Sequence, residues 1–332
     1  QQYCIQISMI RYWGYPAESY DVTTEDGYIL NMIRIPSGRF GTVAEINSTG
    51  CGRTPILLMH GLFCDAATFV LNPHDSSPAM FLADMGFDVF LPSSRGTTNS
   101  QRHVNLTTSD AQFWKFTQDD MARYDTPAFI DKILELNGAE ALYYVGHSQG
   151  TTIGFMALAE RPEYNKKVRA MFQLAPAGPN YERKGLLRLL FGAQQLLMPV
   201  VNAYKRILGS HEFGLHVPGL LSNIARTVCP PFFSVCRDVM FLAIGPPSAA
   251  FNLVRNILLI IDILFIIGIR RRRKLASQGA RNAIEHFDIS PSENLRRYGE
   301  IVALPYNYKL VDTDVYLFWS RNDWLTTPDN IK

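Results

Sequence analysis

The chain has 332 residues, of which 47% are hydrophobic and 19% are charged, a composition that argues against widespread disorder. This length suits one large domain or a domain that carries an inserted cap. The formal net charge of +2 argues against a general attraction to nucleic acid or acidic membranes, although residues 270–274 form a local basic run. The first residues do not form a charged start followed by an apolar stretch, so we expect no signal peptide within this sequence.

Strands and helices are predicted to alternate along the first half of the chain. Residues 21–35 predict two strands around a turn at Asp26-Gly27. A helix is expected over residues 119–136, where Pro127 must bend it or lie near its start. Short apolar strands are expected at 55–59, 88–91, 141–145 and 168–174, and a second helix at 151–160. This alternation predicts an α/β fold with a mostly parallel sheet and helices on both faces.

The alternation stops after Leu174. Residues 181–290 are irregular and rich in large apolar side chains, and the strand pattern resumes at residues 314–320. We therefore expect an α/β core in two parts, residues 1–180 and 291–332. Residues 181–290 form an insertion between them, a cap whose size is that of a small domain.

A candidate nucleophile lies in the pentapeptide Gly146-His147-Ser148-Gln149-Gly150, which matches the pattern Gly-x-Ser-x-Gly. The pattern alone occurs by chance in about one chain in ten of this length. Here, however, an apolar strand enters it and a helix leaves it, which is the setting of a nucleophile elbow. Such a turn strains the serine backbone and lifts its Oγ clear of the sheet. The sequence therefore predicts a serine hydrolase with Ser148 as nucleophile, rather than a buried glycine-rich turn.

A serine hydrolase also needs two backbone N–H donors for the oxyanion of its tetrahedral intermediate. The first belongs to the residue after the nucleophile, here Gln149. The second comes from the loop after an earlier strand. His60-Gly61-Leu62-Phe63 directly follows the strand at residues 55–59, and we assign the second donor to the N–H of Leu62.

The acid of the triad is expected after a late strand, in the chain order Ser, Asp, His. Asp323 lies in the turn beyond residues 315–320 and is the preferred candidate. Asp312 and Asp314 precede that strand and so should lie at its wrong end. Asp329 lies further on, after a proline that suggests the start of a helix.

Together, these residues resemble the acid lipase family, which includes gastric and lysosomal acid lipases. The resemblance covers residues 8–180 and, more weakly, 285–332. It implies an α/β-hydrolase fold with a cap over the active site. It also implies hydrolysis of neutral lipid esters, such as triacylglycerols or steryl esters, through an acyl-enzyme, at a lipid droplet or micelle surface, without a cofactor. Secreted or lysosomal residence is implied as well. The stretches that carry the resemblance are residues 12–16, 24–28, 60–62, 94–96, 113–116, 124–127, 146–152 and 322–323.

The five cysteines cannot all pair within one chain. Cys229 and Cys236 are close enough in sequence to close a small loop, and the resemblance implies a cap disulfide at this place. No Cys/His cluster has zinc-like spacing, so we predict no metal site. The triplets that begin at Asn47 and Asn105 are acceptor patterns for N-glycosylation.

Two features depart from the family pattern. The first is the apolar stretch at residues 257–269. As a helix it would span about 20 Å, short of the roughly 30 Å of a bilayer core, and it contains Asp262. We therefore expect no transmembrane span. A buried cap segment is our preferred interpretation; a lipid-facing lid with a basic edge and sequence from outside the native reading frame remain alternatives.

The second departure is the missing triad histidine, which should follow Asp323. All seven histidines precede it, and His286 is the least unsuitable substitute, although a structural role suits it better. We therefore expect the sequence to be truncated beyond Lys332, and the chain as written to be inactive alone. The alternative function is a non-catalytic lipid-binding relative of the lipases. A peptidase of the same fold has little support.

Overall fold

The computed structural model describes residues 3–40, 52–62, 64–177, 284–287, 289–321 and 323. Contacts within the chain divide it into two units. The first, which we call the sheet unit, comprises residues 1–107, 115–176 and 283–318. The second comprises residues 108–114, 177–282 and 319–332. The predicted cap at 181–290, with Cys229 and Cys236, lies almost wholly outside the described residues, as do Asn47 and the stretch at 257–269.

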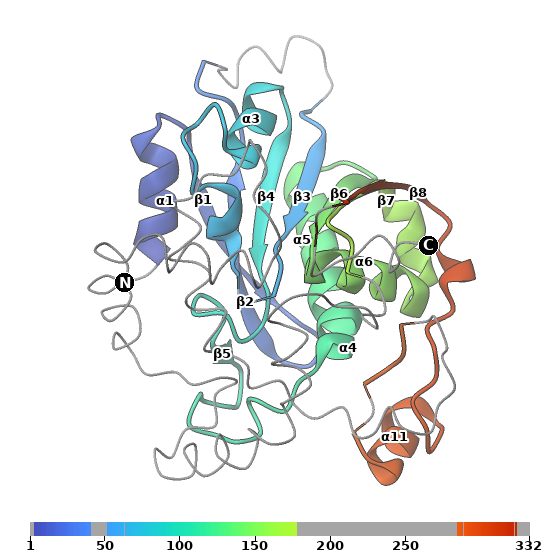
Figure 1. Cartoon of the computed structure of the whole chain (residues 1–332). Coiled ribbons are helices and arrows are strands. Elements are labelled where there is room, and N and C mark those ends of the chain that lie inside the picture. Colours follow the sequence, from blue (N-terminus) through green and yellow to red (C-terminus); the bar gives the residue numbers. More distant parts are fainter. Residues whose placement is uncertain are drawn as a thin grey trace, which may run out of the picture. The chain divides into compact units, whose positions relative to one another are not determined.

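The sheet unit is built on a mixed sheet that has eight strands in the described residues (Figure 1). Seven strands lie in the order β1-β2-β4-β3-β6-β7-β8, and β5 pairs with β2. β2 pairs antiparallel with β1 and with β4. The pairs β4–β3, β3–β6, β6–β7 and β7–β8 are parallel. The strands are β1 (Glu18–Thr23), β2 (Tyr28–Ile35), β3 (Pro55–Met59), β4 (Asp88–Ser93), β5 (Arg102–His103), β6 (Leu142–His147), β7 (Val168–Leu174) and β8 (Asp314–Phe318). The predicted mostly parallel sheet is confirmed.

Helices cover both faces of this sheet, as predicted. On one face, Ile10 of α1 and Met80 of α3 share a buried cluster with Leu58 of β3. On the other, Gly154 of α6 lies directly against Tyr144 and Met171. Burial on both faces explains why β3 and β4 are buried along their whole length. The helices are α1 (Tyr3–Tyr12), η1 (Ala66–Phe69), α3 (Pro78–Asp84), α4 (Gln118–Asp120), η2 (Met121–Asp125), α5 (Thr126–Asn137), α6 (Gln149–Glu160), η3 (Pro162–Lys167), α11 (Pro291–Tyr298) and η4 (Tyr308–Leu310).

The helix predicted over residues 119–136 is divided in the structure. α4 passes into the π-helical turn η2 and then into α5. Pro127 is the second residue of α5, directly after the π-helical turn, so it lies near the start of the α-helical part of this run, one of the two placements expected. Among the described residues, no helix combines the length and apolar character that a membrane crossing requires.

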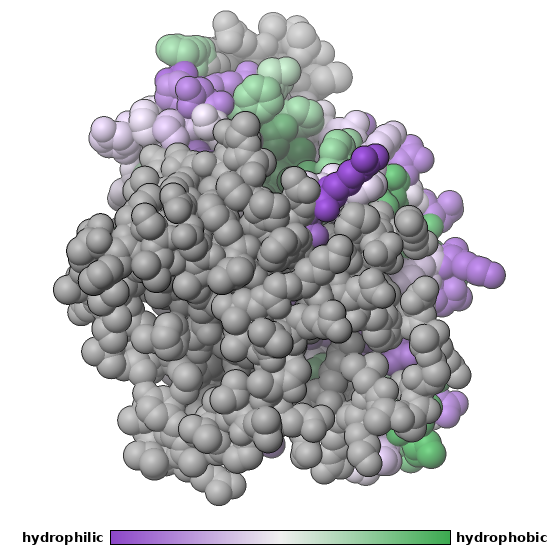
Figure 2. Space-filling model, in the orientation of Figure 1, coloured by the Kyte–Doolittle hydropathy of each residue, from purple (hydrophilic) through white to green (hydrophobic). Residues whose placement is uncertain are grey.

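Apolar side chains reach the surface around α3, in the upper part of Figure 2. Phe81 and Met85 there are more than half exposed. α3 ends at Asp84 and β4 begins at Asp88, so this surface lies at the amino end of the parallel strands. Ligands of open α/β sheets bind at the carboxyl ends instead, and the candidate site is found there.

Candidate active site

Ser148 occupies the sharp turn between β6 and α6. Its backbone has φ 51° and ψ −116°, in the left-handed region that residues other than glycine rarely adopt. Such a conformation costs about 1–3 kcal/mol and persists only where the surroundings enforce it. The N–H of Ser148 donates to the carbonyl of Leu174 at 3.0 Å, and its own carbonyl accepts from the N–H of Thr151 at 3.0 Å. The local geometry is therefore that of a nucleophile elbow.

The glycines on either side of Ser148 leave no room for a side chain. A Cβ atom on Gly146 would lie 2.4 Å from Oε1 of Gln173, and one on Gly150 would lie 2.5 Å from the carbonyl oxygen of Met59. Both distances are shorter than real Cβ contacts. Gly146 is thus packed against β7 and the start of α6, and Gly150 against the end of β3, which is why the sequence needs glycine at both positions.

The loop after β3 lies beside the nucleophile. β3 pairs with β6 in the register Met59 opposite Gly146, so the two strands end at the same level. A Cβ atom on Gly61 would lie 3.1 Å from the Cβ of Ser148. Leu62 follows Gly61, and Gln149 is the first residue of α6, where the N–H groups have no intrahelical acceptor. The predicted oxyanion donors Leu62 and Gln149 therefore directly follow Gly61 and Ser148, two residues that lie side by side at the elbow.

The strand register separates the acidic candidates. Asp314 pairs with Ala170, level with the start of β6, whereas Phe318 pairs with Leu174, level with its end. Asp314, and with it the preceding Asp312, lies at the wrong end of β8, as expected. Asp323 lies beyond the correct end, in a turn where its N–H donates to the carbonyl of Ser320 at 3.3 Å. Asp323 belongs to the second unit, whereas Ser148 belongs to the first, so the role of Asp323 as the acid of the triad stays a prediction. Asp329 is outside the described residues.

His286 is too far from Ser148 to act as its base. Its Nδ1 lies 3.2 Å from Oδ1 of Asp119, and its Nε2 lies 3.9 Å from Oε2 of Glu160. Glu160 is the last residue of α6, and Ser148 is the N-cap of the same 12-residue helix. At about 1.5 Å per residue the two helix ends are roughly 18 Å apart. His286 therefore has a structural role.

That role centres on the buried carboxylate of Asp119. Besides His286, this carboxylate accepts from the hydroxyl of Tyr306 at 2.5 Å and from the N–H of Phe287 at 3.0 Å. The ring of His286 also stacks against Tyr306, with ring centroids 3.9 Å apart. These contacts hold the segment around residues 284–306 against α4, which contains Asp119, and against the end of α6, which contains Glu160. The sequence offers no signal for this cluster, because Asp119 and His286 are 167 residues apart.

Two other kinds of reactive site are possible in principle, a cysteine nucleophile and a metal centre. Burial raises the pKa of the Cys64 thiol, so this free cysteine is not a thiolate nucleophile. No group of three or more His, Cys, Asp or Glu side chains in the described part of the chain could hold a metal ion.

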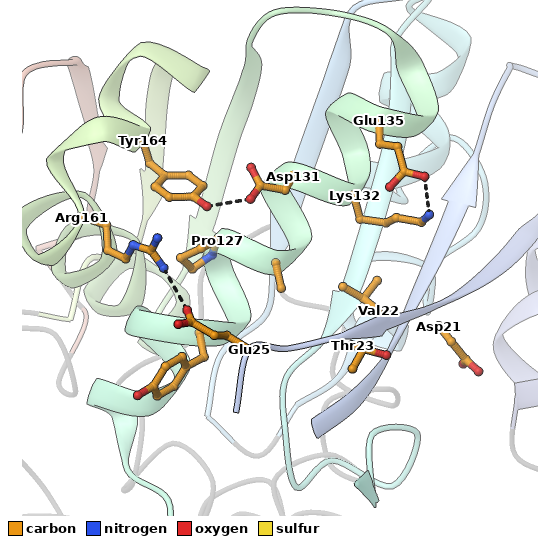
Figure 3. Close-up of a pocket in the computed structure, with 12 residues that line it drawn as sticks. Asp21, Val22, Thr23, Glu25, Pro127, Asp131, Lys132, Glu135, Arg161 and Tyr164 are labelled. Carbon is orange, nitrogen blue, oxygen red and sulfur yellow. Dashed lines mark hydrogen bonds and ion pairs between the residues drawn. The ribbon is translucent and has the colours of Figure 1, made fainter. Parts of the chain in front are cut away.

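A surface pocket of about 510 Å³ lies between β1, α5 and η3 (Figure 3). Several of its polar side chains pair with one another. Tyr164 donates to Asp131 at 2.7 Å, and Lys132 bridges to Glu135 at 2.8 Å. Ser148 does not line this pocket, so the pocket is separate from the nucleophile elbow.

Comparison with known proteins identifies related sequences over most of the chain. A model of a partial alpha/beta-hydrolase lipase region matches residues 7–73, and a model of the alpha/beta hydrolase fold matches residues 54–198. Lipase lipl-1 of Caenorhabditis elegans is 36% identical over 97% of this chain and 79% of its own length. The gastric triacylglycerol lipase of Mus musculus is 44% identical over 73% of this chain and 63% of its own length. Among solved structures, a membrane phospholipase A matches with a TM-score of 0.48 at 13% identity, over 99% of this chain and 80% of that one.

Proposed function

Because the chain has the α/β-hydrolase fold and belongs to the acid lipase-like family, it is a hydrolase of the lipase class by descent, and we propose that Ser148 is its nucleophile. The observation that carries this proposal is the strained backbone of Ser148, with φ 51°, at the turn from β6 to α6. Strain of this kind is kept where a side chain must be presented to a substrate.

In the proposed reaction, Oγ of Ser148 attacks the carbonyl carbon of a carboxylic ester. The carbonyl oxygen becomes an oxyanion and is stabilised by the N–H groups of Leu62 and Gln149. The intermediate collapses to an acyl-enzyme as the alcohol leaves with a proton, and water then releases the acid. Asp323 is proposed to orient the histidine that transfers these protons.

His286 is excluded as that histidine by its distance from Ser148. We propose that residues 1–332 alone hydrolyse esters poorly, because a neutral hydroxyl without a base is a weak nucleophile. Binding and the oxyanion donors alone would still give some acceleration over water.

The proposed substrates are neutral lipid esters, triacylglycerols or steryl esters, met at a droplet or micelle surface. Support comes from the relative named a gastric triacylglycerol lipase and from the sequence motifs. We further propose residues 181–290 as a cap over the site, with Cys229 and Cys236 bonded, and a secreted or lysosomal glycoprotein modified at Asn47 and Asn105.

Covalent labelling tests the nucleophile. A fluorophosphonate probe should label the full-length protein at Ser148, and Ser148→Ala should abolish both labelling and ester hydrolysis. Ser8→Ala, on an exposed position of α1, is the matched control and should retain both. Labelling that persists in Ser148→Ala removes Ser148 from the mechanism. A full-length protein that binds lipid esters but is never labelled would favour the lipid-binding alternative.

A further inference from the structure

His60 is a buried histidine that the proposed reaction does not use. Only 4% of it is exposed, although it adjoins the elbow. Its Nε2 lies 3.0 Å from the backbone nitrogen of Ser94, and its Nδ1 lies 2.8 Å from the carbonyl oxygen of Gly61. A backbone N–H can only donate, so Nε2 must be the acceptor. The ring proton then belongs on Nδ1, which donates to Gly61, and the imidazole is neutral with one fixed tautomer.

Both ring nitrogens are therefore occupied by backbone groups. His60 has no free lone pair to take a proton from Ser148, and it is not the general base. Its two partners come from different strands, since Gly61 follows β3 and Ser94 follows β4. The carbonyl of His60 itself borders the elbow, because a Cβ atom on Gly150 would lie 2.8 Å from its oxygen.

The charges around His60 are consistent with a neutral ring. Burial lowers the pKa of His60, while its hydrogen bond to the Gly61 carbonyl and the carboxylate of Asp65 at the start of η1 act in the opposite direction. Arg95, next to Ser94, is neutralised by Asp26 and Asp125. A protonated ring would turn Nε2–H towards the N–H of Ser94, where two donors would face each other.

We propose that His60 is a positioning residue for the oxyanion, and that its neutral imidazole fixes the peptide of Gly61 so that the Leu62 N–H faces Ser148. The proposal rests on the function proposed above and deepens it. Gly61 is in contact with Ser148, so a shift of a few tenths of an ångström in this loop moves the donor relative to the reacting carbonyl. Loss of one preorganised donor typically costs about 10²–10³ in kcat.

The test compares His60→Gln and His60→Asn in the full-length protein. The amide oxygen of Gln can take the place of Nε2 and accept from Ser94, whereas the shorter Asn reaches only the place of Nδ1. Fluorophosphonate labelling counts the active serines, and kcat and KM for a short-chain p-nitrophenyl ester are then expressed per labelled Ser148. We expect His60→Gln, which keeps the Ser94 contact but loses the donor to the Gly61 carbonyl, to lower kcat at least about 30-fold with little change in KM. His60→Asn, whose amide N–H can still donate to Gly61, should recover part of the loss.

Tyr306→Phe is the control for a purely structural effect, because it removes a buried hydrogen bond at the far end of α6. It should lower the thermal midpoint without changing kcat per labelled serine. If both His60 variants also keep the parental kcat per labelled serine, the positioning role is wrong. If the parent itself is not labelled at Ser148, the proposed function fails instead, so the two failures are distinguishable.

Discussion

Gly61 and Ser148 are in such close contact that a Cβ atom on the glycine would lie 3.1 Å from the Cβ of the serine. Contacts of 3.0–3.4 Å are tighter than most real Cβ contacts, so the loop would have to yield slightly. The two residues come from the ends of neighbouring parallel strands, β3 and β6. The placement of the loop that carries the proposed oxyanion donor Leu62 therefore depends on glycine at position 61.

Gly61→Ala is expected to lower kcat about 10-fold or more, since the added methyl group pushes the Leu62 N–H away from the oxyanion. Stability should change little, because the backbone of Gly61 is not in the left-handed region. Gly52→Ala is the matched control, since a Cβ there meets nothing within 4 Å. Parental kcat in Gly61→Ala, measured with a short-chain ester, would contradict a close-packed oxyanion loop.

Backbone strain at Ser148 can be measured separately from chemistry. Ser148→Ala and Ser148→Gly both lack Oγ, but only glycine relieves the positive φ. We expect the Gly variant to be more stable than the Ala variant by about 1 kcal/mol in urea denaturation. Ala157→Gly, in the interior of α6 where φ is negative, should instead destabilise by about 1 kcal/mol. Equal stability of the two Ser148 variants would mean that the elbow stores no strain.

The Asp119 cluster should stabilise the protein over a defined pH range. Burial acts to raise the pKa of Asp119, but hydrogen bonds from His286 and Tyr306 outweigh it and hold the pKa below the ordinary value. A depressed carboxyl pKa gives stability that is present above the unfolded pKa of about 3.9 and is lost as the pH falls through the folded pKa. The contribution should therefore persist at pH 5, begin to fall below about pH 4 and be lost once the pH has passed the folded pKa.

Asp119→Asn is expected to lower the free energy of unfolding by about 2–4 kcal/mol, because it leaves buried donors with a poorer acceptor. The loss should be similar at pH 7 and pH 5, measured by urea denaturation. Asp312→Asn, at an exposed position outside this cluster, should change stability by less than about 0.5 kcal/mol. A loss that already vanishes at pH 5 would contradict the depressed pKa.

Contacts between neighbouring elements could be predicted from the sequence, whereas contacts between distant ones could not. The strands, the elbow setting and the wrong position of Asp314 all follow from local apolar patterns and from chain order. The partners of Asp119 and the acceptor role of His60 do not, because they join residues that only the fold brings together. Periodicity carries no information on such pairs. The π-helical turn at Met121–Asp125 was missed for a similar reason, since its buried Asp125 faces Arg95 from another loop.

The glycosylation pattern at Asn105 lies on exposed chain after β5. Its N–H donates to Nδ1 of His103 at 3.0 Å, while the residue itself is exposed. Expression through a secretory pathway is expected to attach a glycan there, seen as a gel shift that an N-glycosidase removes. Asn105→Gln and Thr107→Val should each remove the part of the gel shift that is caused by the glycan on Asn105. An unchanged glycopeptide map in both variants would show that Asn105 is not used.

Arg95 joins the loop after β4 to two carboxylates, those of the buried Asp125 and the partly exposed Asp26. Its Nη1 and Nη2 donate to Asp26 at 2.6 and 2.9 Å, and its Nε donates to Asp125 at 2.7 Å. Only 2% of Arg95 is exposed. The guanidinium thus connects the β1–β2 turn, η2 and the loop whose Ser94 N–H binds His60.

Arg95→Lys keeps the charge but cannot serve both carboxylates with its single ammonium group. We expect it to cost about 2–5 kcal/mol of unfolding free energy, because one buried carboxylate loses its partner. Arg102→Lys is the matched control. Arg102 pairs with Asp21, both partners are about half exposed, and exposed pairs contribute little. It should change stability by less than about 0.5 kcal/mol in the same urea titration. Equal effects of the two substitutions would mean that the buried pairing of Arg95 does not stabilise the fold. A large loss for Arg95→Lys alone would establish that Arg95 anchors the loop whose Ser94 N–H binds His60.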